Sequence, residues 1–404
     1  MQKRLVEINV SLNWGSTGRI AEQIGACAEK QGWDVYIVHG ARYINKSAFK
    51  HIQVSTRIEE FIHWLYSFLW DAQGLGSFFA TKRLIRRLKK VSPTLVHCHN
   101  IHGCYINYPI LFSYLKENNI PVVWTFHDCW PFTGHCAYYI EANCEKWKSH
   151  CKQCPATKSF PNSICDKSSR NFDKKKNVYG LFDNLTIVPV TNWLAEEVKQ
   201  SFLSQATIKS IHNGIDVSVF SFIESDIRQK YNITAKYVLL SVATGFDERK
   251  GLEDYNKLSD ILSEEFQIIL VGGLERGCNV KLSDKILLLP KTKDQKELAC
   301  FYSCSDLLLS LSYAETFGLT MVEAMACGTP VVVYDNTAQS EVVSDETGIK
   351  VQTGNVHKVA EAIIEICKRG KDEFSEKCRK YAVNYFNKDN QCQKYVDLFS
   401  ELAR

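Results

Sequence analysis

The chain has 404 residues, of which 45% are hydrophobic and 23% are charged, which is typical of a soluble globular protein and excludes a disordered chain. Its formal net charge of +4 is too small to indicate a nucleic-acid partner, and no stretch is long and apolar enough for a transmembrane helix. Sixteen cysteines without a signal peptide indicate a cytoplasmic, reducing setting with free thiols or metal ligands instead of a disulfide scaffold.

Short apolar runs alternate with helical patterns along the whole chain. The first set of expected strands is Leu5–Val10, Val35–His39, Leu95–His99, Val122–His127 and Leu185–Val190. The second set is Tyr237–Ala243, Gln267–Val271, Ile286–Leu289, Asp306–Leu311 and Val331–Tyr334. Continuous apolar strands separated by helices predict parallel sheets covered on both faces. We therefore expect an α/β fold with two doubly wound, Rossmann-like domains and a ligand at the carboxyl ends of the strands.

The domain boundary is expected between Val190 and Val219, where an Asn-Gly turn lies within His212–Asp216. We predict a first domain at residues 1–195, with a cysteine-rich insertion at 129–165, and a second domain at 196–385. The tail at 386–404 has a helical pattern and no strand.

A glycine-containing loop, Asn13–Arg19, follows the first strand and opens a helix that continues to Lys30. Gly15 and Gly18 allow a tight turn and the close approach of a phosphate or sugar, although such glycines often serve the turn alone. The spacing is not the full dinucleotide fingerprint, which argues against an oxidoreductase.

An aromatic stretch, Ile58–Trp70, precedes a basic helix at Lys82–Lys90. One interpretation is a peripheral enzyme that docks on an anionic membrane surface. The other is a core helix followed by a solvated helix.

His127 ends a buried strand and is followed by Asp128. It is either a core histidine satisfied by the backbone or a ligand-contacting group that can shuttle a proton. Asp128 would then orient it or contact the acceptor. His97, His99, Asn100 and His102, near the end of the preceding strand, are weaker candidates.

Four cysteines are spaced Cys136-x7-Cys144-x6-Cys151-x2-Cys154 in a polar stretch with few core residues. The Cys-x2-Cys pair suits tetrahedral zinc, and a loop without a core of its own often needs a metal. The first two spacings are irregular for a zinc ribbon, so free thiols or a disulfide stay open. His135 and Cys165 are reserve ligands, and four sulfur ligands would leave no open catalytic position.

The segment Ser312–Tyr334 carries the strongest chemical signal. A helix from about Gly318 to Cys327 should end with Gly328 as a left-handed cap. Its start presents the backbone N–H groups of Phe317, Gly318, Leu319 and Thr320, which make an anion site suited to a diphosphate. Glu315 in the loop and Glu323 in the helix can accept hydrogen bonds from hydroxyls, Glu323 from a ribose diol.

The string from Glu315 to Val332, with Glu-x7-Glu at its start, resembles the donor-site signature of the retaining family-four glycosyltransferases of GT-B fold. The resemblance implies two Rossmann-like domains that face each other across a cleft, with the last helix crossing back to the first domain. It implies that Gly15 and Gly18 close over the donor phosphate, that His127 faces the transferred sugar, and that the loop at Gly272 lies beside the nucleotide. The string His127–Cys136 further resembles a subgroup that builds bacterial exopolysaccharides.

A transferase of this fold usually lacks a catalytic metal, so fixed cations must neutralise the leaving diphosphate. Lys250, followed by Gly251, matches the Lys-Gly pair of the family. Where the family often has an arginine six residues earlier, this chain has Thr244, and Arg249 is the candidate substitute.

The expected function is therefore hexosyl transfer, with retention, from a UDP- or GDP-linked sugar to a glycan or lipid-linked acceptor. Bacterial surface-polysaccharide synthesis on the cytoplasmic side of the membrane is the setting that the resemblance implies. The alternatives are a nucleotide-sugar epimerase or hydrolase of GT-B fold, or a non-enzymatic, zinc-bound binding module. Glu141 and Glu145 interrupt the few basic residues of the cysteine cluster, so we expect no nucleic-acid partner.

Overall fold

The computed structural model describes residues 2–180, 182–275, 277–278 and 280–403. The chain forms two compact units, one of Met1–His212 with Asp389–Arg404, the other of Asn213–Lys388. The first unit extends past the predicted limit of residue 195, because a short strand at Thr207–Ile208 pairs with its sheet. The tail joins it from Asp389 instead of residue 386.

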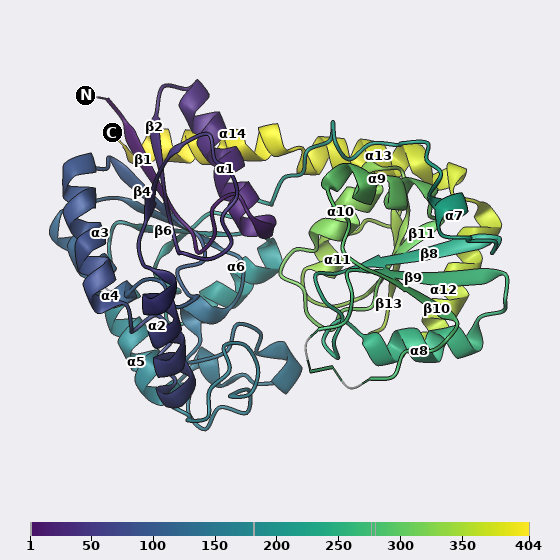
Figure 1. The fold of residues 1–404 in the computed structure, drawn as a ribbon, viewed down its shortest axis with the longest axis horizontal. Coiled ribbons are helices and arrows are strands. Elements are labelled where there is room, and N and C mark those ends of the chain that lie inside the picture. Colours follow the sequence, from purple (N-terminus) through teal and green to yellow (C-terminus); the bar gives the residue numbers. More distant parts are fainter. Residues whose placement is uncertain (1, 181, 276, 279, 404) are drawn as a thin grey trace. The chain divides into compact units, whose positions relative to one another are not determined.

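The sheet of the first unit has seven strands in the order β3-β2-β1-β4-β5-β6-β7, and all its pairs are parallel. Figure 1 labels β1, β2, β4 and β6 of this sheet. The strands are β1 (Arg4–Ile8), β2 (Asp34–His39), β3 (Lys50–Gln53), β4 (Leu95–Cys98), β5 (Val122–Phe126), β6 (Leu185–Pro189) and β7 (Thr207–Ile208). Every residue of β4, β5 and β6 is buried, because helices cover both faces. The direction of winding reverses between β1 and β4, which makes their carboxyl ends the switch point of this sheet.

The helices of the first unit are α1 (Gly15–Lys30), α2 (Arg57–Trp70), α3 (Phe78–Val91), α4 (Tyr108–Glu117), α5 (Ser168–Tyr179), α6 (Asn192–Lys199) and α14 (Lys388–Leu402). Thr56 and Glu59 form a capping box that fixes the start of α2. Near the middle of α14, the Tyr395 hydroxyl lies 3.1 Å from Thr125 Oγ1 of β5, so the tail packs against this sheet.

The sheet of the second unit has six strands in the order β10-β9-β8-β11-β12-β13, again with parallel pairs. The strands are β8 (Tyr237–Val242), β9 (Phe266–Val271), β10 (Ile286–Leu289), β11 (Leu307–Ser310), β12 (Val331–Tyr334) and β13 (Gly348–Val351). The helices are α7 (Ile227–Lys230), α8 (Leu252–Ile261), α9 (Gln295–Cys304), α10 (Leu319–Ala326), α11 (Gln339–Val342), α12 (Val356–Arg369) and α13 (Asp372–Phe386). The switch point of this sheet lies between β8 and β11.

Two parallel α/β sheets confirm the predicted fold class. Within the described ranges, none of the helices combines the length and the apolar character needed to cross a membrane.

Candidate active site

The switch point of the second unit carries an ion pair between Lys250 and Glu315. Lys250 precedes α8 in the loop after β8, and Glu315 lies in the loop after β11. Gly251 has φ of +73°, and a Cβ atom there would lie 2.2 Å from the carbonyl oxygen of Leu311, so glycine is required where the two loops meet. The Glu315 amide donates to Thr337 Oγ1 at 3.1 Å, which fixes its loop.

The electrostatics of this pair favour a charged carboxylate. Burial raises the pKa of Glu315, but the positive charges of Lys250 and Arg249 lower it by more, and the net pKa lies below the ordinary value. Arg249 Nη1 lies 3.4 Å from the Ala314 carbonyl oxygen, so its guanidinium lies along the same loop. The structure thus brings together three of the predicted residues, two cations and one anion, at the place where open α/β sheets bind ligands.

Helix α10 begins beside this pair and has the predicted limits within one residue at each end. Its N-cap, Gly318, has φ of +90° and no side chain that could cap the first turn. The first N–H groups of a helix lack acceptors within the helix, so those of Leu319 and Thr320 are suited to an anion. Gly328 has φ of +78°, as the predicted left-handed cap requires.

Glu323 lies in the middle of α10 and is only 7% exposed. The Tyr302 hydroxyl of α9 donates to Glu323 Oε2 at 2.8 Å and holds the carboxylate in one orientation. Sequence reasoning did not find Tyr302, because α9 carries no motif around it.

Gly272 directly follows β9 and has φ of +134°. A Cβ atom there would lie 1.7 Å from the Ala243 carbonyl oxygen. Only glycine therefore allows the chain after β9 to come this close to the chain after β8.

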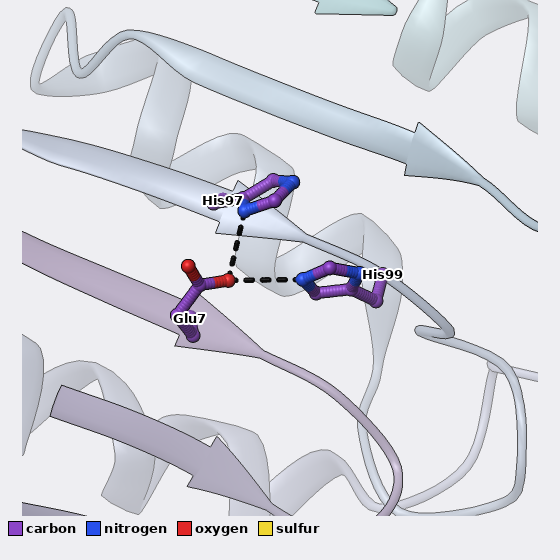
Figure 2. A group of neighbouring side chains, drawn as sticks. All are labelled: Glu7, His97 and His99. Carbon is purple, nitrogen blue, oxygen red and sulfur yellow. Dashed lines mark hydrogen bonds and ion pairs between the residues drawn. The ribbon is translucent and has the colours of Figure 1, made fainter. Parts of the chain in front are cut away.

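In the first unit, a buried cluster of Glu7, His97 and His99 occupies the switch point between β1 and β4 (Figure 2). Glu7 is the ladder partner of His97, and its Oε2 lies 2.8 Å from His97 Nδ1 and 2.9 Å from His99 Nε2. The other nitrogen of His99, Nδ1, lies 3.0 Å from Nε2 of His127, at the end of β5. Glu7, which sequence reasoning missed, therefore connects to the predicted His127 through His99.

This chain of groups can hold its protons in two ways. Burial raises the pKa of Glu7 and lowers those of His99, to about 3, and His127, to about 4. With Glu7 ionised, His99 donates to it and accepts from His127, whose Nδ1 then carries a lone pair. With Glu7 protonated, every bond reverses and His127 Nδ1 carries a hydrogen. The protonation state of Glu7 therefore determines which ring nitrogen of His127 carries the hydrogen.

Asp128 does not orient His127 as its neighbour in sequence would suggest. It accepts from His102 Nε2 at 2.7 Å and from the Trp130 amide at 2.9 Å. The predicted orienting role belongs to His99, because β4 and β5 are adjacent and their ends place the two histidines side by side.

Gly15 and Gly18 lie at the start of α1. Gly15 has φ of +67°, and a Cβ atom on Gly18 would lie 2.7 Å from Ser11 Oγ. Both glycines are thus needed for the turn itself, whatever further contact they make.

Family profiles match both halves of the chain. Glycosyltransferase Family 4 matches residues 17–219, which is half of the chain, and Glycosyl transferases group 1 matches residues 223–385. The protein belongs to the family-4 glycosyltransferases. It is accordingly a transferase enzyme of GT-B fold.

Individual relatives are distant. The glycosyltransferase is 21% identical to the putative colanic acid biosynthesis glycosyl transferase WcaC of Escherichia coli, over 98% of this chain and 100% of that protein. It is 26% identical to N-acetyl-alpha-D-glucosaminyl L-malate synthase of Bacillus anthracis, over 56% of this chain and 62% of the relative.

Solved structures agree with the fold. Sucrose-phosphate synthase of Thermosynechococcus elongatus has a TM-score of 0.70 at 17% identity, over 99% of both chains. HepE of Anabaena, solved with UDP, has a TM-score of 0.68 at 15% identity, over 99% of this chain and 100% of that one.

The aromatic stretch at α2 is not a core helix in this glycosyltransferase. Its buried residues are the polar Glu60, His63 and Ser67. Its exposed residues include Ile58, Phe61, Ile62, Trp64, Leu65 and Trp70, and Phe78 and Phe79 at the start of α3 are exposed as well. The apolar face is therefore turned to solvent.

The four predicted metal-ligating cysteines, Cys136, Cys144, Cys151 and Cys154, line one small cavity together with His135. By contrast, Glu7, His97 and His99 are the group of described residues whose candidate ligand atoms all lie within 4.8 Å of one another. His99 Nε2 is hydrogen-bonded to Glu7 Oε2, whereas His97 Nδ1 lies near the same oxygen without a hydrogen-bond partner among the described residues. The cysteine sulfurs are spaced more widely.

Proposed function

We propose that the enzyme transfers a sugar from a nucleotide-diphosphate sugar to a glycan or lipid-linked acceptor, with retention of the anomeric configuration. The observation that carries this proposal is the Lys250–Glu315 pair beside the start of α10, at the switch point of the second sheet. Cations and helix amides favour a diphosphate, and a carboxylate beside them favours sugar hydroxyls.

Each residue then has a role in binding the donor. Lys250 and Arg249 neutralise the leaving diphosphate together with the amides of residues 317–320. Glu323 accepts from the ribose diol, with Tyr302 holding it in place. Glu315 accepts from hydroxyls of the transferred sugar, His127 hydrogen-bonds to another hydroxyl, and the loop of Gly272 lies beside the nucleotide.

We propose attack on the same face of the sugar from which the diphosphate leaves. The acceptor oxygen bonds to the anomeric carbon, the bond from that carbon to the diphosphate oxygen breaks, and the acceptor proton passes to the departing phosphate. The carboxylates of the second unit have roles in this proposal as hydrogen-bond acceptors and ion-pair partners, and none is assigned as a covalent nucleophile. Positioning and charge stabilisation would supply the acceleration.

The donor is expected to carry UDP or GDP. Solved structures of HepE with UDP and with UDP-glucose support testing UDP first. The likeness to WcaC, a putative colanic acid glycosyl transferase, supports a role in bacterial cell-surface polysaccharide synthesis.

We further propose that the acceptor is reached at a membrane surface. The exposed aromatic face of α2 continues to Phe78 and Phe79, and α3 then carries basic side chains, with Lys82 Nζ lying 4.3 Å from the Phe78 ring centroid. Apolar side chains beside cations suit the interface of an anionic bilayer.

The decisive assay uses the full chain with UDP- and GDP-linked sugars, with and without lipid-linked acceptors. NMR of the product should show a new glycosidic bond with the donor's anomeric configuration. Release of free sugar at the same rate without acceptor would indicate a hydrolase instead, and an isomerised nucleotide sugar would indicate an epimerase.

A further inference from the structure

The insertion at residues 129–165 encloses a small cavity beside buried aromatic side chains, which include Trp130, Phe132 and Trp147. Every residue of the segment is described, and its regular structure consists of three single-turn 3-10 helices: Trp130–Phe132, Ile140–Ala142 and Lys146–Lys148. The lining of the cavity includes His135 and the four cysteines Cys136, Cys144, Cys151 and Cys154. Metal ligands are a common further source of rigidity for a segment with so little regular structure.

His135 is prepared as a ligand. Its Nδ1 lies 2.6 Å from Asp71 Oδ1, and its side chain is fully buried. Because Nδ1 donates to the carboxylate, Nε2 of a neutral ring carries a lone pair. This Nε2 is buried and has no hydrogen-bond partner among the residues that the structure describes. A histidine held by a carboxylate on one nitrogen and open on the other is the arrangement that proteins use for metal-ligating imidazoles.

The proposed sulfur ligands lie at the same cavity as His135. Cys136, Cys151 and Cys154 line the cavity together. The Gly134 amide donates to Cys151 Sγ at 3.2 Å. Backbone donors stabilise a negatively charged sulfur more than a neutral thiol.

A buried cation lies next to the cluster. Lys175 of α5 is 1% exposed, and its Nζ lies 2.5 Å from the Trp130 carbonyl oxygen and 3.0 Å from the Thr133 carbonyl oxygen. A buried ammonium needs negative charge nearby. Three thiolates and one neutral imidazole around a divalent cation carry a net charge of −1, which Lys175 would balance.

We propose that this cavity binds one structural zinc ion through Cys136, Cys151, Cys154 and His135 Nε2. Three sulfurs and one imidazole form a tetrahedral set of a kind that structural zinc sites use. Cys144 lines the cavity as the competing fourth ligand, which the sequence spacing had favoured. No three of these candidate ligand atoms all lie within 4.8 Å of one another in the described structure. Zinc binding must therefore bring the four ligand atoms closer together.

The test begins with the metal content of the full chain, purified without chelators or a metal-affinity tag. Mass spectrometry of the metal should give one zinc per chain, and a thiol-blocking reagent should release it. Replacement by Co²⁺ should give the visible bands of tetrahedral cobalt with thiolate ligands. Wild-type protein that contains no zinc and does not take it up under reducing conditions would overturn the proposal, as would a Cys136–Cys154 disulfide formed inside cells.

Variants then identify the ligands. Cys151→Ser and His135→Ala should lose zinc, whereas Cys165→Ser, in the same insertion but not among the residues lining the cavity, should keep it. Cys144→Ser should also keep zinc and an unchanged cobalt spectrum. Loss of zinc in Cys144→Ser together with retention in His135→Ala would contradict the proposed ligand set. The wild-type measurements decide the existence of the site even where a variant does not fold, and they are independent of the proposed donor chemistry.

Discussion

Nδ1 of His99 lies 3.0 Å from Nε2 of His127, and Nε2 of His99 lies 2.9 Å from Oε2 of Glu7. One histidine therefore connects a fully buried carboxylate on β1 to the histidine at the end of β5. Such a connection fixes which nitrogen of His127 carries a proton, although Glu7 and His127 are far apart in sequence.

Glu7→Gln should lower kcat without a matching change in KM for the nucleotide sugar. The amide cannot exchange a proton with His99. The ring nitrogen of His127 that carries the hydrogen can then no longer change with the protonation state of residue 7. We expect a loss of about 10- to 100-fold, as for other partners that orient functional histidines. In a plot of kcat against pH, one of the two pH-dependent slopes should disappear.

Glu60→Gln is the matched control for Glu7→Gln. Glu60 is a buried carboxylate of the same unit, and it binds the Ala41 amide and Ser55 away from His127. It should change stability but leave the pH profile intact. An identical profile in wild type and Glu7→Gln would rule out the relay.

Mild acid should destabilise the first unit. Burial lowers the pKa of His63 and of His127 from 6.5 to about 4, so their neutral forms contribute stability that is present above pH 6.5 and is lost as the pH falls towards 4. The loss should be at least about 1 kcal/mol for each fully buried histidine. The raised pKa of Glu7 acts in the opposite sense, because its contribution is present below its ordinary value of 4.5 and is lost as the pH rises through its folded-state pKa.

Urea unfolding followed between pH 7 and pH 4 measures this effect. His63→Gln should flatten the dependence without touching Glu7, His99 or His127, because His63 bonds to Ser77 and the Gly76 amide. A free energy of unfolding that stays constant over this range would show that these histidines are not buried as described.

Lys250→Ala should reduce turnover more than donor binding. Negative charge on the leaving diphosphate grows as its bond to the sugar breaks, so a fixed cation acts mainly in the transition state. We expect a loss of roughly 100-fold or more in kcat. Arg249→Ala should have a similar effect if Arg249 replaces the arginine missing at Thr244.

Lys257→Ala provides the control for both cations, since Lys257 is an exposed lysine on α8 paired with Asp254. It should retain full activity. A Lys250→Ala enzyme as active as Lys257→Ala would show that the site has been misplaced.

Glu323→Ala should instead weaken donor binding. The carboxylate is proposed to hold the ribose in ground state and transition state alike, so the change should raise KM and leave kcat nearly constant. Loss of one charged hydrogen-bond acceptor corresponds to about 1.5–3 kcal/mol, or roughly 10- to 150-fold in affinity. Tyr302→Phe should show the same trend more weakly. Unchanged donor binding in both variants would show that the ribose does not bind at Glu323.

Phe61→Ser with Trp64→Ser should abolish flotation with anionic vesicles while activity on a water-soluble acceptor persists. Both side chains are exposed on α2, so their removal should cost no folding stability. Tyr385→Ser, which removes an exposed aromatic residue of the second unit, is the matched control. Equal flotation of the double variant and the control would contradict the proposed membrane docking. Wild-type protein that does not float with the vesicles would contradict it as well.

The sequence predicted ten strands because each is a continuous apolar run between helices. It missed β3, β7 and β13: β3 is mostly exposed and polar, β7 has two residues, and β13 contains Gly348 and Lys350. No local hydrophobic signal marks such strands, which form because neighbouring strands supply their partners.

The candidate site was predictable where its residues lie within one segment, as from Glu315 to Glu323. Glu7, Tyr302 and Asp71 were missed because each meets its partner through tertiary contacts. The apolar stripe of α2 marks a helix face, but periodicity is the same for a core face and a docking face. The burial of Glu60, His63 and Ser67 shows that the apolar face of α2 is not a core face.

The central claim is that a nucleoside diphosphate binds to the second unit at Lys250, Glu323 and the start of α10. The most direct test is a thermal-shift titration of wild type and Glu323→Ala with UDP, GDP, ADP and NAD. A ligand at 100 times its Kd adds about 2.7 kcal/mol of stability, which is readily measured. We predict a shift with UDP or GDP alone, and a much smaller one in Glu323→Ala. No shift with any of the four, or equal shifts in both proteins, would contradict the account.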